Sequence, residues 1–313
     1  MGRGLWLILG VAVVTCMVVP AWAGVVVVTD TTHKSLMTFD DTNGALLNSS
    51  YLSMSAQGMG NPIDAKIVGA NEFWVSDKSN DQVLRYALDT NAYLGLITNT
   101  NIVSPMGMEV VGNTVYLANA SSSLHKVAKL DATTHAVTGT FTVGSTSLGV
   151  PYDVQAYSPS AGVTNLLVDD ANTGTVGNDI DMYNTSGTWL SKVINGGGSG
   201  QIHQPQQLAI TSANAILAGG SVSPYGIYEY DSTGATLNYW SRTTGVRGVY
   251  ELQNANHDIL FTDTNGVHLL ARSSGTVTDV VTGVSANFID TWVPEPSSLA
   301  LFALAAVGLL RRR

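Results

Sequence analysis

Short runs of β-branched and aromatic residues alternate along the chain with clusters of Asn, Gly, Ser and Asp. This pattern is typical of β-strands joined by turns. One phrase recurs, in which an apolar run is followed by a small residue and then by Asp or Asn. Its copies end at Asp30, Asp77, Asn119, Asp170 and Asp263, and Ile216 to Gly219 form a weaker sixth copy. The sequence shows no long amphipathic helical pattern, so it predicts an all-β fold built from repeats.

Three further strands accompany each copy of this phrase. A second phrase follows and ends in a turn, at Phe39-Asp40, Leu88-Asp89, Leu130-Asp131, Tyr183-Asn184, Tyr230-Asp231 and, weakly, Arg272-Ser273. A strand then leaves each turn, as in Thr236 to Ser241. An opening strand precedes the first phrase, and its copies begin near Pro62, Pro105, Pro151, Pro205 and Gly245. The repeat therefore has four strands and a period of roughly 41–54 residues, which is the range of propeller blades.

The two ends of the array complete each other. The first copy lacks an opening strand, because Gly24 leads directly into Val25. The last copy is followed by an additional opening strand at Asn287 to Asp290. Pairing this strand with the first blade gives a closed six-bladed β-propeller without free sheet edges. The arrangement is similar to six-bladed propellers of the NHL-repeat and gluconolactonase-like kind, and a β-helix or a seven-bladed ring are the alternatives.

Residues 1–23 have the features of a secretory signal. Arg3 is followed by the apolar run from Leu5 to Val19, and Ala21 and Ala23 form a small-x-small cleavage pattern. The segment predicts a signal helix, export by the Sec machinery and cleavage after Ala23. A retained membrane anchor and a lipoprotein processed at Cys16 are the alternatives. Cleavage after Ala23 removes Cys16, the one cysteine, so the mature chain has no thiol chemistry.

The C-terminus has three parts in a fixed order. The motif Pro294, Glu295 and Pro296 is followed by an apolar run from Ser297 to Leu310, and the chain closes with Arg311, Arg312 and Arg313. The run predicts a short hydrophobic helix whose arginines stay on the cytoplasmic side. The three parts resemble the PEP-CTERM sorting signal of Gram-negative bacteria, and a plain tail anchor is the alternative. We accordingly divide the chain into a signal peptide (1–23), a propeller domain (24–293) and a sorting signal (294–313).

The resemblance to a PEP-CTERM sorting signal also predicts partners and location. It implies recognition by an exosortase, cleavage near the motif and transient anchoring of the C-terminal helix in the inner membrane. The mature protein is then expected at the cell surface or in the extracellular matrix. Proteins with this signal tend to accompany exopolysaccharide and biofilm production, so exopolysaccharide is a candidate partner.

Composition and charge exclude two classes of protein, disordered chains and nucleic-acid binders. Hydrophobic residues make up 45% of the chain and charged residues 12%, which argues against intrinsic disorder. Ten of the 14 Lys and Arg and 22 of the 23 Asp and Glu lie within residues 24–293, giving that body a net charge near −12. This charge argues against nucleic acid as a partner, because phosphates are bound by clustered basic residues.

The opening strands should line the central channel and present candidate ligands there. Two residues after the Pro position, the six copies give Asp64, Gly107, Asp153, Gln207, Gly248 and Asp290. We expect Asp64, Asp153, Gln207 and Asp290 to lie at one level, where their oxygen atoms suit Ca²⁺ or Mg²⁺. A solvated acidic rim is the alternative. The recurrent Asp of the first phrase is expected to accept backbone N–H groups in the next turn.

Signs of catalysis are sparse in the sequence. His203 is the one histidine expected near the channel mouth, and no Ser-His-Asp order, phosphate loop or HExxH motif is present. Trp74, Trp189 and Trp240 suit either a sugar-binding shelf or packing between blades. The sequence favours an exported binding or structural component without catalysis. The resemblance to gluconolactonase-like propellers implies the alternative, a divalent-metal-dependent hydrolase of sugar lactones or related esters.

Overall fold

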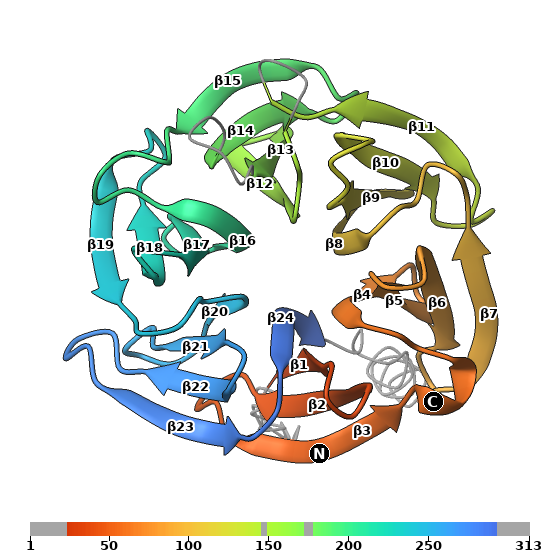
Figure 1. Ribbon diagram of the computed structural model, residues 1–313, viewed down its shortest axis with the longest axis horizontal. Coiled ribbons are helices and arrows are strands. Elements are labelled where there is room, and N and C mark those ends of the chain that lie inside the picture. Colours follow the sequence, from red (N-terminus) through yellow and green to blue (C-terminus); the bar gives the residue numbers. More distant parts are fainter. Residues whose placement is uncertain (1–23, 145–148, 172–177, 293–313) are drawn as a thin grey trace, which may run out of the picture.

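The computed structural model describes residues 24–144, 149–171 and 178–292. They form six four-stranded antiparallel sheets arranged as a closed ring (Figure 1). The predicted all-β, six-bladed propeller is therefore confirmed. The expected signal helix and C-terminal hydrophobic helix fall on residues 1–23 and 293–313, outside the described part. No helix of the described part is long and apolar enough to cross a membrane.

Each blade runs from an inner strand beside the channel to an outer strand at the rim of the ring. Blade 1 contains β24 (Ala286–Trp292), β1 (Val25–Asp30), β2 (Ser35–Asp40) and β3 (Leu46–Ser53), and a short 3₁₀ helix (Ser55–Gln57) follows β3. Blade 2 contains β4 (Pro62–Val68), β5 (Glu72–Asp77), β6 (Gln82–Ala87) and β7 (Tyr93–Thr98). Blade 3 contains β8 (Pro105–Val111), β9 (Thr114–Asn119), β10 (Lys126–Asp131) and β11 (Val137–Thr142).

The second half of the ring repeats this order. Blade 4 contains β12 (Val154–Ser160), β13 (Val163–Asp170), β14 (Asp179–Asn184) and β15 (Trp189–Ile194). Blade 5 contains β16 (His203–Ile210), β17 (Ile216–Val222), β18 (Gly226–Tyr230) and β19 (Thr236–Ser241). Blade 6 contains β20 (Val249–Glu251), β21 (Ile259–Thr262), β22 (Gly266–Leu270) and β23 (Val277–Thr282).

The last strand closes the ring as the sequence predicts. β24 pairs with β1 in antiparallel register, with Val28 opposite Ile289 and Val25 opposite Trp292. The Trp292 ring packs edge-on against Phe73 of blade 2, with 4.6 Å between ring centroids. Strand pairing and aromatic packing thus tie the end of the described chain to its beginning.

The core lies between the blades, because both faces of each sheet are covered by neighbouring sheets. Trp74, fully buried, packs against Val115 and Leu117 of blade 3, so packing between blades is its role. The turns that lead to the outer strands use glycine where the backbone is left-handed, as at Gly44 (φ 72°) and Gly234 (φ 84°).

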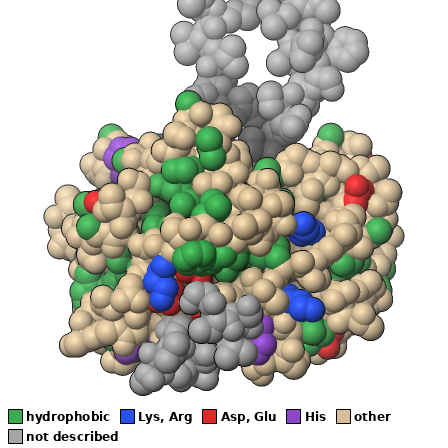
Figure 2. Space-filling model, turned by 90° about the horizontal axis from the view of Figure 1, so that it is seen from above, with side chains coloured by type: hydrophobic (Ala, Val, Ile, Leu, Met, Phe, Trp, Pro, Cys, Tyr) green, Lys and Arg blue, Asp and Glu red, His purple; other side chains and the backbone are tan. Residues whose placement is uncertain are grey.

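The ring has two faces that differ in what the chain places there. We call the side on which the six inner strands begin the entry face, and the side on which they end the exit face. Val25 and Trp292 both lie on the exit face, since one starts the second strand of blade 1 and the other ends its inner strand. Figure 2 shows part of the rim between the faces, where charged side chains are few and hydrophobic side chains form a patch near the middle of the view, with others scattered around it.

Candidate functional site

The pairing register aligns the inner strands with one another. In each blade, one residue of the inner strand pairs with the equivalent residue of the second strand. These inner-strand residues are Ala65, Met108, Val154, Leu208, Val249 and Ile289. One residue earlier, the aligned positions are Asp64, Gly107, Asp153, Gln207, Gly248 and Phe288. The predicted common level of Asp64, Asp153 and Gln207 is therefore correct.

The prediction that Asp290 shares this level is wrong. The register places Phe288 there and puts Asp290 two residues further along the channel, level with Lys66 and Glu109. The sequence misled because β24 has no proline to mark the register: Ala286 faces Asp30 as Pro62 faces Asp77, so Ala286 occupies the Pro position and Phe288 follows it by two residues. Taking Phe288 as the equivalent of Pro62 moved the expected level of Asp290 by two residues.

Asp64 and Asp153 join neighbouring blades. Asp64 Oδ2 accepts the backbone N–H of Met108 at 2.7 Å, from blade 2 to blade 3. Asp153 Oδ2 accepts that of Leu208 at 2.8 Å, from blade 4 to blade 5. Burial, with repulsion from Asp290, raises the pKa of Asp64 to about 7. Burial also raises the pKa of Asp153 well above its usual range.

Gln207 joins three blades through its amide. Its Oε1 accepts the backbone N–H groups of Val249 at 3.0 Å and Ile289 at 2.9 Å. Its Nε2 donates to the Ile289 carbonyl at 2.6 Å. Glutamine suits this position because one side chain satisfies two donors and one acceptor without carrying a charge.

Glycine occupies two of the six positions because neighbouring groups approach closely. A Cβ at Gly107 would lie 1.9 Å from Asp153 Oδ1. A Cβ at Gly248 would lie 2.5 Å from the Asn287 carbonyl oxygen. Five of the six aligned positions thus hold either a side chain that hydrogen-bonds a neighbouring blade or no side chain at all.

The sixth aligned residue, Phe288, separates the channel into two parts. Phe288 is 2% exposed and packs with Ile63 and Met106, which are also buried. These three apolar side chains stand between the start of the inner strands and the ion-paired residues further along. The entry-face mouth and the exit-face end of the channel are therefore chemically distinct sites.

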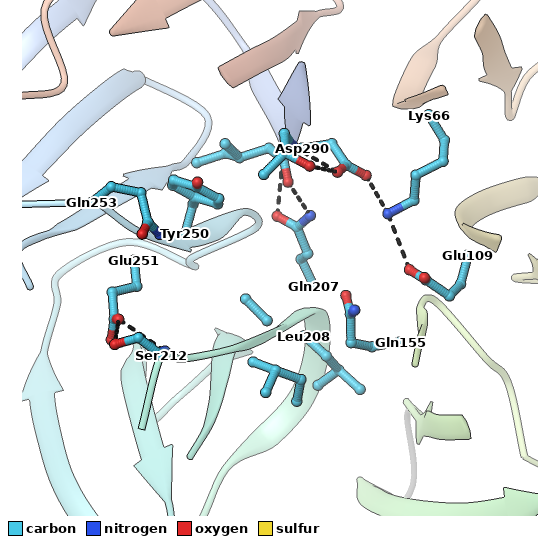
Figure 3. A pocket seen from close by; sticks show the side chains of 14 residues that line it. Lys66, Glu109, Gln155, Gln207, Leu208, Ser212, Tyr250, Glu251, Gln253 and Asp290 are labelled. Atoms are coloured by element: carbon cyan, nitrogen blue, oxygen red, sulfur yellow. Dashed lines mark hydrogen bonds and ion pairs between the residues drawn. The ribbon is translucent and has the colours of Figure 1, made fainter. Parts of the chain in front are cut away.

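At the exit-face end, Lys66 lies between two carboxylates (Figure 3). Its Nζ forms an ion pair with Asp290 and lies 3.1 Å from Glu109 Oε2. Burial alone would lower the pKa of Lys66, but the carboxylates of Asp290 and Glu109 raise it well above its ordinary value. Burial raises the pKa of Glu109.

These groups line a cavity of about 290 Å³ at the exit-face end of the channel. All six inner strands contribute to its wall, through Lys66, Glu109, Gln155, Leu208, Tyr250, Asp290 and their neighbours. Gln155 is half-buried, and its amide makes no hydrogen bond within the described residues. Figure 3 shows this amide beside Gln207, facing the same space. The cavity is at the lower end of the size range of small-molecule sites.

The described residues contain no group of three or more His, Cys, Asp or Glu side chains placed to hold a metal ion. Asp64 Oδ1 is a buried oxygen without a hydrogen-bond partner, whereas Asp64 Oδ2 and both oxygens of Asp153 accept backbone N–H groups. Metal binding by Asp64, Asp153, Gln207 and Asp290 stays a prediction. With Asp290 at another level, these four residues do not form one ring.

The other residues singled out in the sequence have local roles. The first-phrase aspartates bond turn amides as predicted, as Asp77 does with Gly60 N and Asn61 N at 2.8 Å. His203 is half-buried, and its Nε2 lies 3.2 Å from the Gly198 carbonyl oxygen. Trp189 is 43% exposed on the outermost strand of blade 4, far from the channel.

Comparison with solved structures shows the same fold in proteins of different function. The chain resembles one in the nidogen/laminin complex, with a TM-score of 0.65 and 13% identity over 87% of this chain and 99% of the other. It also resembles virginiamycin B lyase from Staphylococcus aureus, solved with quinupristin. The TM-score is 0.56, and the identity is 12% over 87% of this chain and 93% of the other. A protein of unknown function from Bacteroides caccae has a TM-score of 0.59 and 11% identity to this chain, over 86% of this chain and 98% of the other.

These identities establish the propeller fold alone. No curated protein matches the chain in sequence. Residues 293–313 match the PEP-CTERM protein-sorting motif. The motif implies Sec export, transient anchoring of the C-terminus in the membrane and processing by an exosortase. The chain thus combines a six-bladed β-propeller with a PEP-CTERM sorting motif.

Proposed function

We propose that the protein is a non-catalytic binding component of the cell surface or extracellular matrix, associated with exopolysaccharide. The sorting motif supports delivery outside the cell. The cavity at the exit-face end of the channel carries the proposal, because six inner strands converge there on one small polar space.

The chemistry of this cavity favours a neutral, hydroxyl-rich ligand such as one sugar unit. The positive charge of Lys66 is matched by Asp290 and Glu109, so no free cation remains to bind an anion. The Gln155 amide offers both a donor and an acceptor. The Tyr250 hydroxyl is a further polar group in the cavity wall.

The alternative hydrolase needs carboxylates that are free to hold a divalent metal. Asp153 uses both oxygens on backbone N–H groups, and Asp290 is ion-paired with Lys66. This arrangement supports binding in preference to metal-dependent hydrolysis. The dependence of the melting temperature on calcium tests the alternative.

Glycan-array binding followed by calorimetry tests the proposed function. The exported protein should bind a neutral sugar or a fragment of a neutral polysaccharide. Gln155→Ala should weaken this binding by about tenfold, since one uncharged hydrogen-bonding group contributes roughly 0.5–1.5 kcal/mol. Gln253→Ala at the margin of the cavity is the milder comparison. Failure of every neutral glycan to bind, or equal binding by Gln155→Ala, would contradict the proposal.

A further inference from the structure

Lys78 and Arg247, two basic side chains at the entry-face mouth of the channel, form no ion pair within the described residues. In the body, Lys66, Arg85, Lys192 and Arg272 form ion pairs with carboxylates. Within the described residues, neither Lys78 nor Arg247 has a carboxylate oxygen within 4.0 Å. Lys34, Lys126, Lys129 and Arg242 also form no ion pair in the described part of the chain, but Lys78 and Arg247 lie close enough together that the charge of Arg247 lowers the pKa of Lys78.

Both cations lie at the entry-face mouth of the channel. Lys78 follows β5 of blade 2, and its Nζ lies 5.4 Å from the ring centroid of Tyr152 in blade 4. Arg247 directly precedes the inner strand of blade 6. Three alternate blades thus direct Lys78, Tyr152 and Arg247 to the mouth, above the apolar group of Phe288, Ile63 and Met106.

The acidic groups of the entry face are engaged elsewhere. Asp77 accepts the backbone N–H groups of Gly60 and Asn61. Asp263 accepts hydrogen bonds from Thr244 and from the Asn265 amide, and it pairs with His268. These carboxylates hold their own turns and form no ion pair with Lys78 or Arg247, although the negative charge of Asp263 acts to raise the pKa of Arg247 against the effect of burial.

The guanidinium of Arg247 has one edge free. Its Nη1 donates to Ser285 Oγ at 2.9 Å and to Asn287 Oδ1 at 3.0 Å, and both acceptors are neutral. Its Nε and Nη2 donate to no acceptor within the described part of the chain. A carboxylate matches this pair of donors with two parallel hydrogen bonds.

The same protein shows that geometry at another arginine. Arg85 Nε donates to Glu72 Oε2 at 2.9 Å, and Arg85 Nη2 donates to Glu72 Oε1 at 2.8 Å. Arg247 presents the same two nitrogens without an internal carboxylate.

We infer that the entry-face mouth of the channel binds a small carboxylate-bearing ligand. The Nε–Nη2 edge of Arg247 holds the carboxylate, Lys78 adds a second positive charge, and the Tyr152 ring contacts the body of the ligand. Burial lowers the pKa of Lys78 and that of Arg247, and the positive charge of Arg247 lowers the pKa of Lys78 further. An anion bound between them would relieve this repulsion.

Titration calorimetry with the exported protein tests the inference. The probe is benzoate, with benzamide as its uncharged counterpart and inorganic phosphate as a different oxyanion. Benzoate should bind with a Kd of about 1 mM or lower, and benzamide should not. Lys78→Gln and Arg247→Gln should each weaken benzoate binding by about tenfold or more. Arg247→Lys should weaken it too, because lysine keeps the charge but lacks the paired donors.

Two controls locate the effect. Lys34→Gln removes a charge from another turn of the entry face, and Gln155→Ala alters the exit-face cavity; both should leave benzoate binding unchanged. If Arg247→Gln does not fold, Arg247→Lys and Lys78→Gln still test the inference. Absence of benzoate binding, equal loss in Lys34→Gln, or tighter binding of phosphate than of benzoate would each overturn the inference.

Discussion

At the scale of single residues, the channel holds carboxylates whose ionised form is disfavoured. Asp64 is 2% exposed, and burial together with repulsion from Asp290 raises its pKa to about 7. An unfolded chain ionises the same group near pH 4. The folded state therefore holds this proton more tightly, and Asp64 lowers stability progressively as the pH rises from about 4 through 7.

Asp64→Asn should consequently stabilise the protein at alkaline pH. The amide oxygen can still accept the Met108 N–H, and no charge is buried. We expect a gain of up to about 4 kcal/mol in the free energy of unfolding at pH 8, which disappears near pH 4. Urea unfolding at both pH values measures the difference. A destabilised variant at pH 8 would contradict this role of Asp64.

Calcium distinguishes this role of Asp64 from metal binding. If the channel carboxylates bind Ca²⁺, a calcium concentration a hundredfold above Kd raises the free energy of unfolding by ~2.7 kcal/mol. The Asp153→Ala variant should then lose most of that increase. If they only bridge blades, as we propose, calcium and magnesium leave the melting temperature unchanged. A melting temperature that rises with calcium in the wild type alone would restore the hydrolase alternative.

His268 supplies a second pH-dependent contribution, which also decreases as the pH rises but arises from stabilising a charged group. Its Nε2 lies 3.1 Å from Asp263 Oδ1, and its Nδ1 lies 2.7 Å from Asp279 Oδ1. Burial would lower the pKa of His268, but the two carboxylates raise it. The resulting stabilisation is complete below the unfolded pKa of about 6.5 and is lost as the pH rises through the folded pKa.

His268→Gln should therefore cost more stability at pH 5.5 than at pH 9. Paired urea titrations of wild type and variant at these two values measure the difference. Asp279→Asn removes only the exposed partner, so it should abolish part of the pH dependence and not all of it. A loss that is equal at both pH values would show that His268 acts by packing alone.

At the scale of elements, strand order and blade number followed from the repeated phrases, but the level of a residue did not. Asp64, Asp153 and Gln207 were aligned correctly because each follows a proline by two residues. β24 has Ala286 in place of this proline, so taking Phe288 as its equivalent placed Asp290 at the wrong level. The ion pair of Lys66 with Asp290 depends on the register of β24, which residue spacing alone did not give.

Loss of β24 should open the ring. Truncation after Gly283 removes the partner of β1 and the Trp292 ring that covers Phe73. The exposed edge of β1 should then pair with other chains, and the protein should aggregate. Light scattering and the melting transition of the truncated chain measure this. Trp292→Ala keeps the strand, so it should lose about 3–5 kcal/mol of stability and remain monomeric.

At the scale of the whole molecule, the two faces of the ring have different surroundings while the sorting tail is attached. Trp292 ends on the exit face, and only four residues separate it from the apolar run that begins at Ser297. Four extended residues span about 14 Å, so an anchored tail keeps the exit face near the membrane. The entry face, with Lys78 and Arg247, then points away from it.

Removal of the tail should therefore change the accessibility of the exit-face cavity more than that of the entry face. We expect the mature protein to end near Pro294, as intact mass spectrometry of the surface fraction would show. Replacing Pro294, Glu295 and Pro296 by alanine should retain the chain in the membrane fraction, because processing depends on the motif. In that retained form, neutral-glycan binding should fall while benzoate binding persists. Recovery of surface protein that still ends at Arg313 would show that the tail is not removed during export.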